Sequence, residues 1–311
     1  MKKLLSLATA ATLFLAGCGA ATLEGENATL DEVVEKDPSE LVVGVSISTL
    51  NNPFFVSLDQ GISELAEENG TTVKSVDAQN DTAKQTNDVD DLIQQGVDIL
   101  LINPVDSSAI TPAVESANAS GIPVITIDRS SEGGQVVTLV ASDNVVGGEM
   151  AAEYIKEISG ADATTVQLEG TPGASATRER GKGFTNVAEE SLNVIDSQTA
   201  NFDRAEGLTV MENMLQANPD IKAVFAQNDE MALGAIEAIQ AAGLTEEIQV
   251  VGFDGTEDGI KAVEAGTLSA TVAQKPEEMG KLAMQAAIDY FAGETLEKYI
   301  ASPLELVTNE E

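Results

Sequence analysis

Polar and aromatic residues recur along this chain directly after short runs of β-branched and other apolar residues. Phe54 and Phe55 come soon after LVVGVSI, Asn103 ends VDILLIN, and Asp128-Arg129 closes PVITIDR. A sugar needs carboxylates, amides, guanidinium donors and flat aromatic faces. Each of its hydroxyls both donates and accepts hydrogen bonds, and the C–H faces of its ring pack on aromatic side chains. The pattern predicts a binding site for a polyhydroxylated small molecule.

Each of these segments also has a plainer interpretation. Asp128-Arg129 is compatible with a surface ion pair, Asn103-Pro104 and Asp254-Gly255 with turns, and the two adjacent phenylalanines with core packing. Their recurrence at nearly every strand end favours one common site. The four arginines of the chain also lie in or next to these segments: Arg129, Arg178, Arg180 and Arg204.

The composition argues against an enzyme. The chain has no histidine and one cysteine, and it lacks a P-loop motif, which removes the usual general base, metal ligands and phosphate cradle. We therefore expect no metal and no cofactor. Carboxylates alone can hydrolyse glycosides, but the aspartates here are matched with arginines, which is expected to keep them ionised and poor as acids.

The elements that must position these residues alternate between short β-branched runs and longer segments of helical periodicity. Such alternation predicts parallel sheets that are covered on both faces. The series restarts near residue 143, which predicts an α/β protein of two doubly wound lobes, and ligands bind such sheets beyond the carboxyl ends of the strands. The expected strands cover residues 41–47, 71–78, 97–103, 123–128, 136–142, 164–170, 193–200, 221–227, 248–254 and 268–274.

The first seventeen residues, MKKLLSLATAATLFLAG, have the positive start, short apolar run and small residues of a secretory signal peptide. Cys18 follows directly, which resembles the lipobox of bacterial lipoproteins, where the thiol is acylated. We expect a signal peptide at 1–17, a lipid anchor at Cys18 on the outer face of the cell membrane, and an acidic flexible tether at 18–40. The alternative is a plain signal peptide with a chance cysteine, or a short membrane helix, although the run is too short to span about 30 Å.

The chain is strongly acidic, with a formal net charge of −36. Removal of the signal peptide, which carries Lys2 and Lys3, makes the charge more negative still. So acidic a surface repels nucleic acid and anionic membranes, and we expect no nucleic-acid partner.

Seven strings identify a family that the chain resembles. STLNNPFFVSL, LLINPVDS, PVITIDR, ASDNVVGG, ATRERGKGF, VFAQNDEMALGA and VVGFDGT are similar to those of the ribose-binding periplasmic proteins, and the resemblance runs from about Leu41 to Thr308. It implies a type I periplasmic binding protein fold, in which two lobes are joined by three hinge crossings and close on a sugar. The implied N-terminal lobe covers 41–142 and 276–302, and the C-terminal lobe covers 143–275 and 303–311. The hinges are then expected near Ser142-Asp143, Gln274-Lys275-Pro276 and Ser302-Pro303.

The resemblance also implies which residues bind the sugar. Phe55 and Phe202 would sandwich the ring, with Phe54 at its edge, and the charged and amide groups would bond to the hydroxyls and the ring oxygen. The implied ligand-binding residues are Asn52, Phe54, Phe55, Asn103, Asp128 and Arg129 in the first lobe, and Arg178, Phe202, Asn228 and Asp254 in the second, with Gln274 near a hinge. Arg180, two residues after Arg178, is expected to point elsewhere.

The implied function is a lipid-anchored solute-binding protein that binds D-ribose and passes it to an ABC permease and its ATPase. The alternatives within this fold are another aldose, such as allose or galactose, a furanosyl signal molecule, or a sugar sensor for a membrane receptor. A DNA-binding repressor core is excluded by the export signal and by the lack of a basic headpiece.

Overall fold

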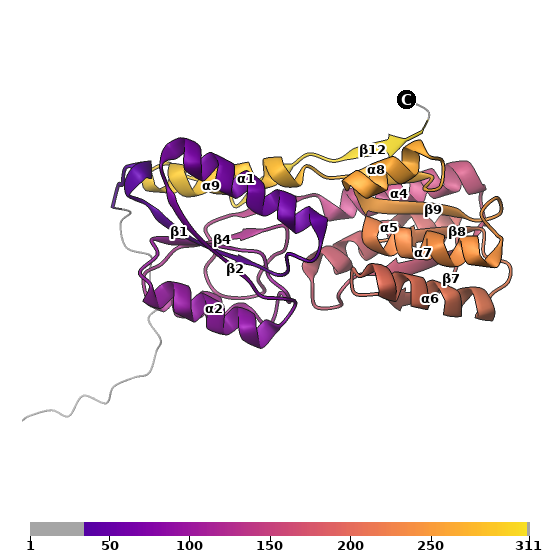
Figure 1. Ribbon diagram of the computed structural model, residues 1–311, viewed down its shortest axis with the longest axis horizontal. Coiled ribbons are helices and arrows are strands. Elements are labelled where there is room, and N and C mark those ends of the chain that lie inside the picture. The colour runs from indigo at the N-terminus through magenta and orange to yellow at the C-terminus, as the bar shows by residue number, and fades with distance from the viewer. Residues whose placement is uncertain (1–33, 310–311) are drawn as a thin grey trace, which may run out of the picture.

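The computed structural model describes residues 34–309 of the protein. Two α/β lobes lie end to end, each built on a six-stranded sheet with helices on both faces (Figure 1). This architecture confirms the predicted fold class. Cys18, the predicted signal peptide and most of the predicted tether lie outside the described residues.

The first lobe has an entirely parallel sheet in the order β11-β5-β4-β3-β1-β2. Figure 1 shows α1 and α9 on one face of this sheet and α2 on the other, and α3 packs beside α2. The elements are η1 (Pro38–Glu40), β1 (Val42–Ile47), α1 (Pro53–Asn69), β2 (Thr72–Asp77), α2 (Thr82–Gln94), β3 (Ile99–Ile102), α3 (Thr111–Ala119), β4 (Val124–Ile127), β5 (Leu139–Ser142), α9 (Pro276–Phe291) and β11 (Tyr299–Ser302).

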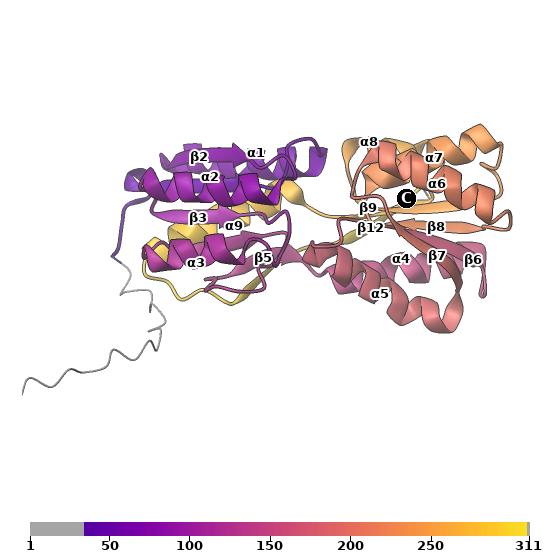
Figure 2. The same ribbon diagram turned by 90° about the horizontal axis from the view of Figure 1, so that it is seen from below.

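The second lobe has the order β12-β10-β9-β8-β6-β7, in which β12 alone runs antiparallel to its neighbour. Figure 2 shows α6, α7 and α8 on one face of the sheet and α4 and α5 on the other. The elements are α4 (Asn144–Ser159), β6 (Thr164–Glu169), α5 (Ser175–Ser191), β7 (Asn193–Thr199), α6 (Arg204–Ala217), β8 (Ala223–Ala226), α7 (Asp229–Ala242), β9 (Gln249–Asp254), α8 (Glu257–Glu264), β10 (Ala270–Ala273) and β12 (Glu305–Thr308).

The chain passes between the lobes three times: after β5, between β10 and α9, and between β11 and β12. The last passage spans only Pro303 and Leu304, so β12 enters the second lobe from the first and runs opposite to β10. Strands β11 and β12 were not predicted from the sequence. Both are four-residue strands at sheet edges and are largely half-buried or exposed, so they lack the continuous apolar run that marks the buried central strands.

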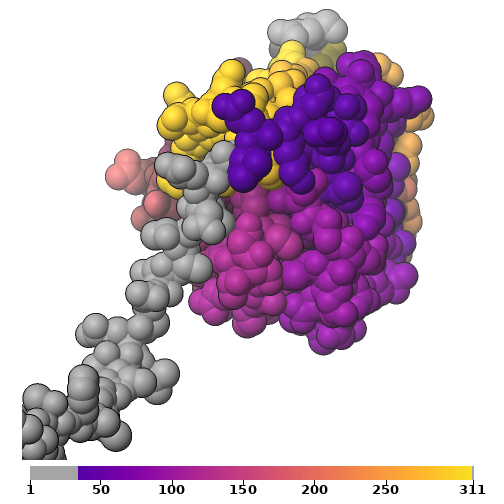
Figure 3. Space-filling model, turned by 90° about the vertical axis from the view of Figure 1, so that its left-hand side faces the viewer, coloured from indigo at the N-terminus to yellow at the C-terminus, as the bar shows by residue number. Residues whose placement is uncertain are grey.

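Helices α1 and α9 meet backbone to backbone although more than 200 residues separate them in the chain. A Cβ atom on Gly61 would lie 2.0 Å from the carbonyl oxygen of Glu277, and one on Gly280 would lie 2.1 Å from that of Leu58. Only glycine permits this approach. Figure 3 shows the N-terminal end of the described chain beside the α9 region at this end of the molecule, where the Lys36 amide donates to the Phe291 carbonyl.

No helix within residues 34–309 is both long enough and apolar enough to cross a lipid bilayer.

Candidate functional site

A small polar cavity lies between the lobes, where the carboxyl ends of the parallel strands of both sheets face each other. This is where sheets of this kind place their ligands. Its walls come from both lobes and consist of Asn52, Phe54, Phe55, Asp128, Arg129, Ala176, Arg180, Phe202 and Asp254. An outer chamber of about 120 Å³ adjoins it and shares Asn52, Phe55, Arg129 and Phe202.

The Asp128-Arg129 pair lies directly beyond β4 and forms the charged wall of the first lobe. Both side chains are buried, and Arg129 Nε lies 3.5 Å from Asp128 Oδ2. Arg129 donates from Nη1 to the Pro104 carbonyl at 3.0 Å. Its guanidinium also lies over two aromatic rings, at 5.1 Å from the centroid of Phe55 and 5.4 Å from that of Phe202. Arg129 therefore contacts an aromatic ring from each lobe.

Arg180 forms the charged wall of the second lobe. It donates from Nε to Asn144 Oδ1 at 2.9 Å and from Nη1 to the Gln227 carbonyl at 2.6 Å. Nη1 also lies 3.4 Å from Asp254 Oδ1, which accepts a second hydrogen bond from Gln274. The guanidinium stacks on Phe253, with 3.8 Å between Arg180 Cζ and the ring centroid. This stacking and the hydrogen bonds together fix the orientation of the guanidinium.

The structure corrects the prediction for the two arginines of α5. Arg180 is buried at the cavity, whereas the Arg178 side chain is 45% exposed and pairs with Glu132 at 2.9 Å outside it. The reason is helical periodicity. Arg180 lies four residues after Ala176, which also lines the cavity, so the two share one face of α5, while Arg178 is turned away. The spacing of Ala176, Arg180 and the buried Phe184 is the sequence signal that identifies the inward arginine.

Asn103 and Asn228 support the cavity without lining it. Asn103 Oδ1 accepts from the Ser48 amide at 3.1 Å, and its Nδ2 donates to the Ile127 carbonyl at 3.1 Å, so it joins the ends of β1, β3 and β4. Asn228 caps α7 by accepting from the Met231 amide, and it donates to the Phe202 carbonyl. These amides fix the strand ends that carry the charged residues.

Three residues of the cavity have a backbone conformation that is unusual for a side-chain-bearing residue. The φ angles are +63° at Asp128, +61° at Phe202 and +112° at Asp254. A Cβ on Gly170 would lie 2.0 Å from the Phe202 ring, so only glycine lets that ring take its place. Strain of this kind costs about 1–3 kcal/mol per residue and gathers at functional sites.

Several buried polar atoms around the cavity have no hydrogen-bond partner in the described part of the chain. They include Asp128 Oδ1, Arg129 Nε and Gln274 Oε1. Buried polar groups in folded proteins are nearly always paired, and leaving one unpaired costs about 1–3 kcal/mol. The unpaired atoms comprise acceptors and a donor, which is the combination that a hydroxyl group satisfies.

Burial raises the pKa of the cavity aspartates, which opposes the expectation that arginines keep them ionised. Burial raises the pKa of Asp254 to about 8, and the Arg180 charge offsets this only in part. Burial likewise raises the pKa of Asp128 and lowers the pKa of the Arg129 guanidinium. Beneath the site, burial raises the pKa of Asp229 to about 6, against hydrogen bonds from Thr271 and Thr256. Desolvation outweighs the opposite charges here.

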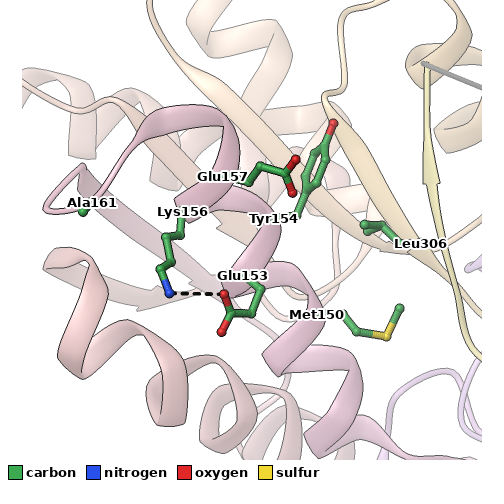
Figure 4. Close-up of a pocket in the computed structure, with 7 residues that line it drawn as sticks. All are labelled: Met150, Glu153, Tyr154, Lys156, Glu157, Ala161 and Leu306. Atoms are coloured by element: carbon green, nitrogen blue, oxygen red, sulfur yellow. Dashed lines mark hydrogen bonds and ion pairs between the residues drawn. The ribbon is translucent and has the colours of Figure 1, made fainter.

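A larger groove, of about 590 Å³, lies away from the cleft on the outer side of the second lobe. Figure 4 shows it between the side chains of α4 and Leu306 of β12, with Lys156 bonded to Glu153. It contains none of the cavity residues, so the cleft remains the candidate site.

The chain matches known proteins over most of its length. The periplasmic binding protein domain family matches residues 43–295. The chain is 61% identical over 269 residues to the ribose import binding protein RbsB of Bacillus subtilis, covering 86% of this chain and 88% of that protein. It is 47% identical over 311 residues to RbsB of Escherichia coli, covering 100% and 99%.

Solved structures match over most of the chain as well. A solute-binding protein of an ABC transporter from Bacillus halodurans, with bound myo-inositol, superposes with a TM-score of 0.83 at 34% identity, covering 88% of this chain and 96% of that one. A periplasmic ribose ABC transporter protein from Conexibacter woesei superposes with a TM-score of 0.77 at 29% identity, covering 90% and 94%.

Proposed function

Because the chain belongs to the periplasmic binding protein family, we propose that it binds D-ribose between its two lobes and delivers the sugar to an ABC importer. It performs no chemistry on the sugar. The observation that carries the proposal is the set of unpaired buried atoms on Asp128, Arg129 and Gln274. Asp128 and Arg129 line a cavity with aromatic rings on both sides, and Gln274 lies behind it and donates to Asp254 of the cavity wall. The relatives with 47–61% identity are named ribose import binding proteins.

In this proposal each lobe supplies half of the ligand contacts. Asp128 and Arg129 bind hydroxyls from the first lobe, and Arg180, Asp254 and Gln274 bind them from the second. Phe55 and Phe202 take the two faces of the ring, and Phe54, which contacts Phe55 edge to face at 5.2 Å, closes one side. Asn52, Asn103 and Asn228 orient these groups and also bind the sugar.

Binding is coupled to closure about the three passages between the lobes. At each of the three passages, near 142–143, 274–276 and 302–303, a short segment joins two separately packed lobes, so rotation there separates the lobes with little loss of packing. A sugar that contacts both lobes favours the closed form. A membrane permease and its ATPase then act on that form, or a membrane sensor does.

The protein is proposed to act outside the cytoplasm, held to the outer face of the cell membrane by a lipid on Cys18. The support is the sequence of the first eighteen residues, with a positive start, an apolar run and a cysteine after small residues.

A second candidate ligand is another aldose, such as D-allose. The relatives include a D-allose-binding periplasmic protein of Escherichia coli at 33% identity, and one matched structure contains D-allose. Unmet hydrogen bonds discriminate such sugars, because each buried unpaired group is costly.

Titration calorimetry with D-ribose, D-allose, D-galactose and myo-inositol tests the proposal. We expect D-ribose to bind with a Kd of about 1 μM or lower, with a smaller radius of gyration in small-angle scattering. Heat with another sugar and none with ribose refutes the ribose assignment. Heat with none of the four refutes the proposed function.

A further inference from the structure

The two lobes are also hydrogen-bonded to each other outside the cavity. The Ser107 amide of the first lobe donates to the Gly173 carbonyl of the second at 3.0 Å, and the Ser175 amide donates back to Ser107 Oγ at 3.1 Å. A third bond runs from the Ser130 amide to Ser175 Oγ at 3.0 Å. We call this contact the cleft lip and define it as Ser107, Ser130 and Glu132 with Gly173, Ser175 and Arg178.

The cleft lip is closely packed. Ser107 and Ser175 are 0% and 3% exposed, so water is excluded from the hydrogen bonds between these two serines. A Cβ on Gly173 would lie 1.8 Å from Asp106 Oδ2, so the loop that precedes α5 approaches the first lobe as closely as a glycine allows. The loop after β4 is tied to the same place, because the Glu132 amide donates to the Ser107 carbonyl at 2.8 Å.

Arg178 joins the outer edge of the cleft lip. Its Nη2 donates to Glu132 Oε1 of the first lobe at 2.9 Å, and its Nη1 donates to the Gly173 carbonyl at 3.0 Å. That carbonyl therefore accepts from both Arg178 and Ser107. Arg178 does not line the cavity, and its side chain is about half exposed.

We propose that the cleft lip is a ligand-independent lock on the closed form, and that Arg178 is a positioning residue that acts on binding through closure. The proposal rests on the proposed function, because it requires a ligand that closes the cleft. The lip bonds join the lobes, so separation of the lobes breaks them whatever ligand is present. Their free energy adds to the closing equilibrium and multiplies the affinity for every ligand by one factor.

The chemistry of the lip suits a lock that must also open. Its donors are mostly backbone amides and its acceptors are a carbonyl and hydroxyls, and water can replace each of them when the lobes part. The exposed Arg178–Glu132 pair adds a modest attraction that salt screens. The cavity residues thus determine which sugar binds, whereas the lip determines how firmly the closed form is held.

Calorimetry on Arg178→Gln, Glu132→Gln and the charge swap Arg178→Glu with Glu132→Arg tests the lock. Each single change is expected to weaken ribose binding about two- to fivefold at low salt, and by the same factor for every other sugar that the wild type binds. The swap is expected to recover part of the loss, and 1 M salt to remove most of the difference from wild type. Lys222→Gln is the control, because Lys222 makes a similarly exposed ion pair with Glu247 inside the second lobe.

The outcomes separate the lock from the proposed function. If the wild type binds no sugar, the proposed function fails and the lock with it. If the wild type binds but the single changes match the Lys222→Gln control, the lock alone is refuted. A loss that differs from sugar to sugar, or that the swap does not relieve, assigns Arg178 to the sugar itself and also refutes the lock.

Discussion

Replacing Arg180 by alanine is expected to nearly abolish ribose binding. The Arg180 side chain is 4% exposed, and it bonds to Asn144, the Gln227 carbonyl and Asp254 while stacking on Phe253. The variant loses hydrogen-bond donors to the ligand, and the buried acceptors that Arg180 paired with in the closed cleft are left without a donor. Loss of one member of a buried charged network costs about 2–5 kcal/mol of binding free energy, which is roughly 30- to 4,000-fold in affinity.

The variant is expected to fold, because Asp254 can respond by changing its protonation. Burial already raises the pKa of Asp254 to about 8, and Arg180 is the main group that opposes this rise. Without the arginine the pKa rises further, so the carboxyl group is neutral at pH 7 and no unpaired charge stays buried. Arg180→Met, which keeps much of the packing on Phe253, controls for the loss of bulk.

Calorimetry with ribose, with circular dichroism as the test of folding, measures the effect. Arg180→Ala and Arg180→Met should lose at least 30-fold in affinity, whereas Arg178→Ala should lose only about two- to fivefold. Equal losses at the two arginines, or a larger loss at Arg178, would show that the cavity as described is not the binding site.

Three further predictions follow from the buried aspartate, the glycine behind Phe202 and the N-terminal cysteine. Because the folded-state pKa of Asp254 lies above its ordinary value of 3.8, the stability that it contributes is present below pH 3.8 and is lost as the pH rises through about 8. Urea unfolding of the wild type should therefore show a fall in unfolding free energy between pH 5 and 8. In Asp254→Asn this fall should be smaller by at least about 1 kcal/mol, whereas in the exposed Asp220→Asn it should equal that of the wild type. Gly170→Ala, whose Cβ would overlap the Phe202 ring, should destabilise the fold by about 1–3 kcal/mol and weaken ribose binding, and an unchanged urea midpoint contradicts the packing described. Cys18→Ser should move the protein from the membrane fraction to the soluble fraction, and full membrane retention excludes the lipid anchor.

Strand order places Asp128 and Asp254 at the carboxyl ends of buried strands, Asp128 after β4 of the first sheet and Asp254 at the end of β9 of the second. That these two sheet ends face each other depends on how the lobes are joined, which the alternation of strands and helices does not specify. The edge strands β11 and β12 are different. Their pairing is fixed by the passage through Pro303 and Leu304 between two completed lobes, which local periodicity does not report.

Which of Arg178 and Arg180 points into the cavity depends on the face of the helix that each occupies, not on residue type. Two arginines separated by one residue are chemically equivalent in the sequence, and only their relation to Ala176 and Phe184 distinguishes the inward one. The protonation of Asp254 could not be read from its arginine partner, because the desolvation that raises its pKa depends on the whole closed cleft.

The contact of α1 with α9 has a consequence for how the chain is made. On one face of the first sheet, α1 contributes Leu58 and Ile62 to the core, and α9 completes that core with Ala283, Met284 and Ala287. Those residues emerge from the ribosome only after the whole second lobe except β12 has been synthesised. The first lobe therefore cannot finish its core during synthesis of its first five strands, and five of the six strands of the second sheet are made before α9. A chain with this order stays incompletely folded until its last segment arrives, which suits a polypeptide that must be threaded through a membrane before it folds.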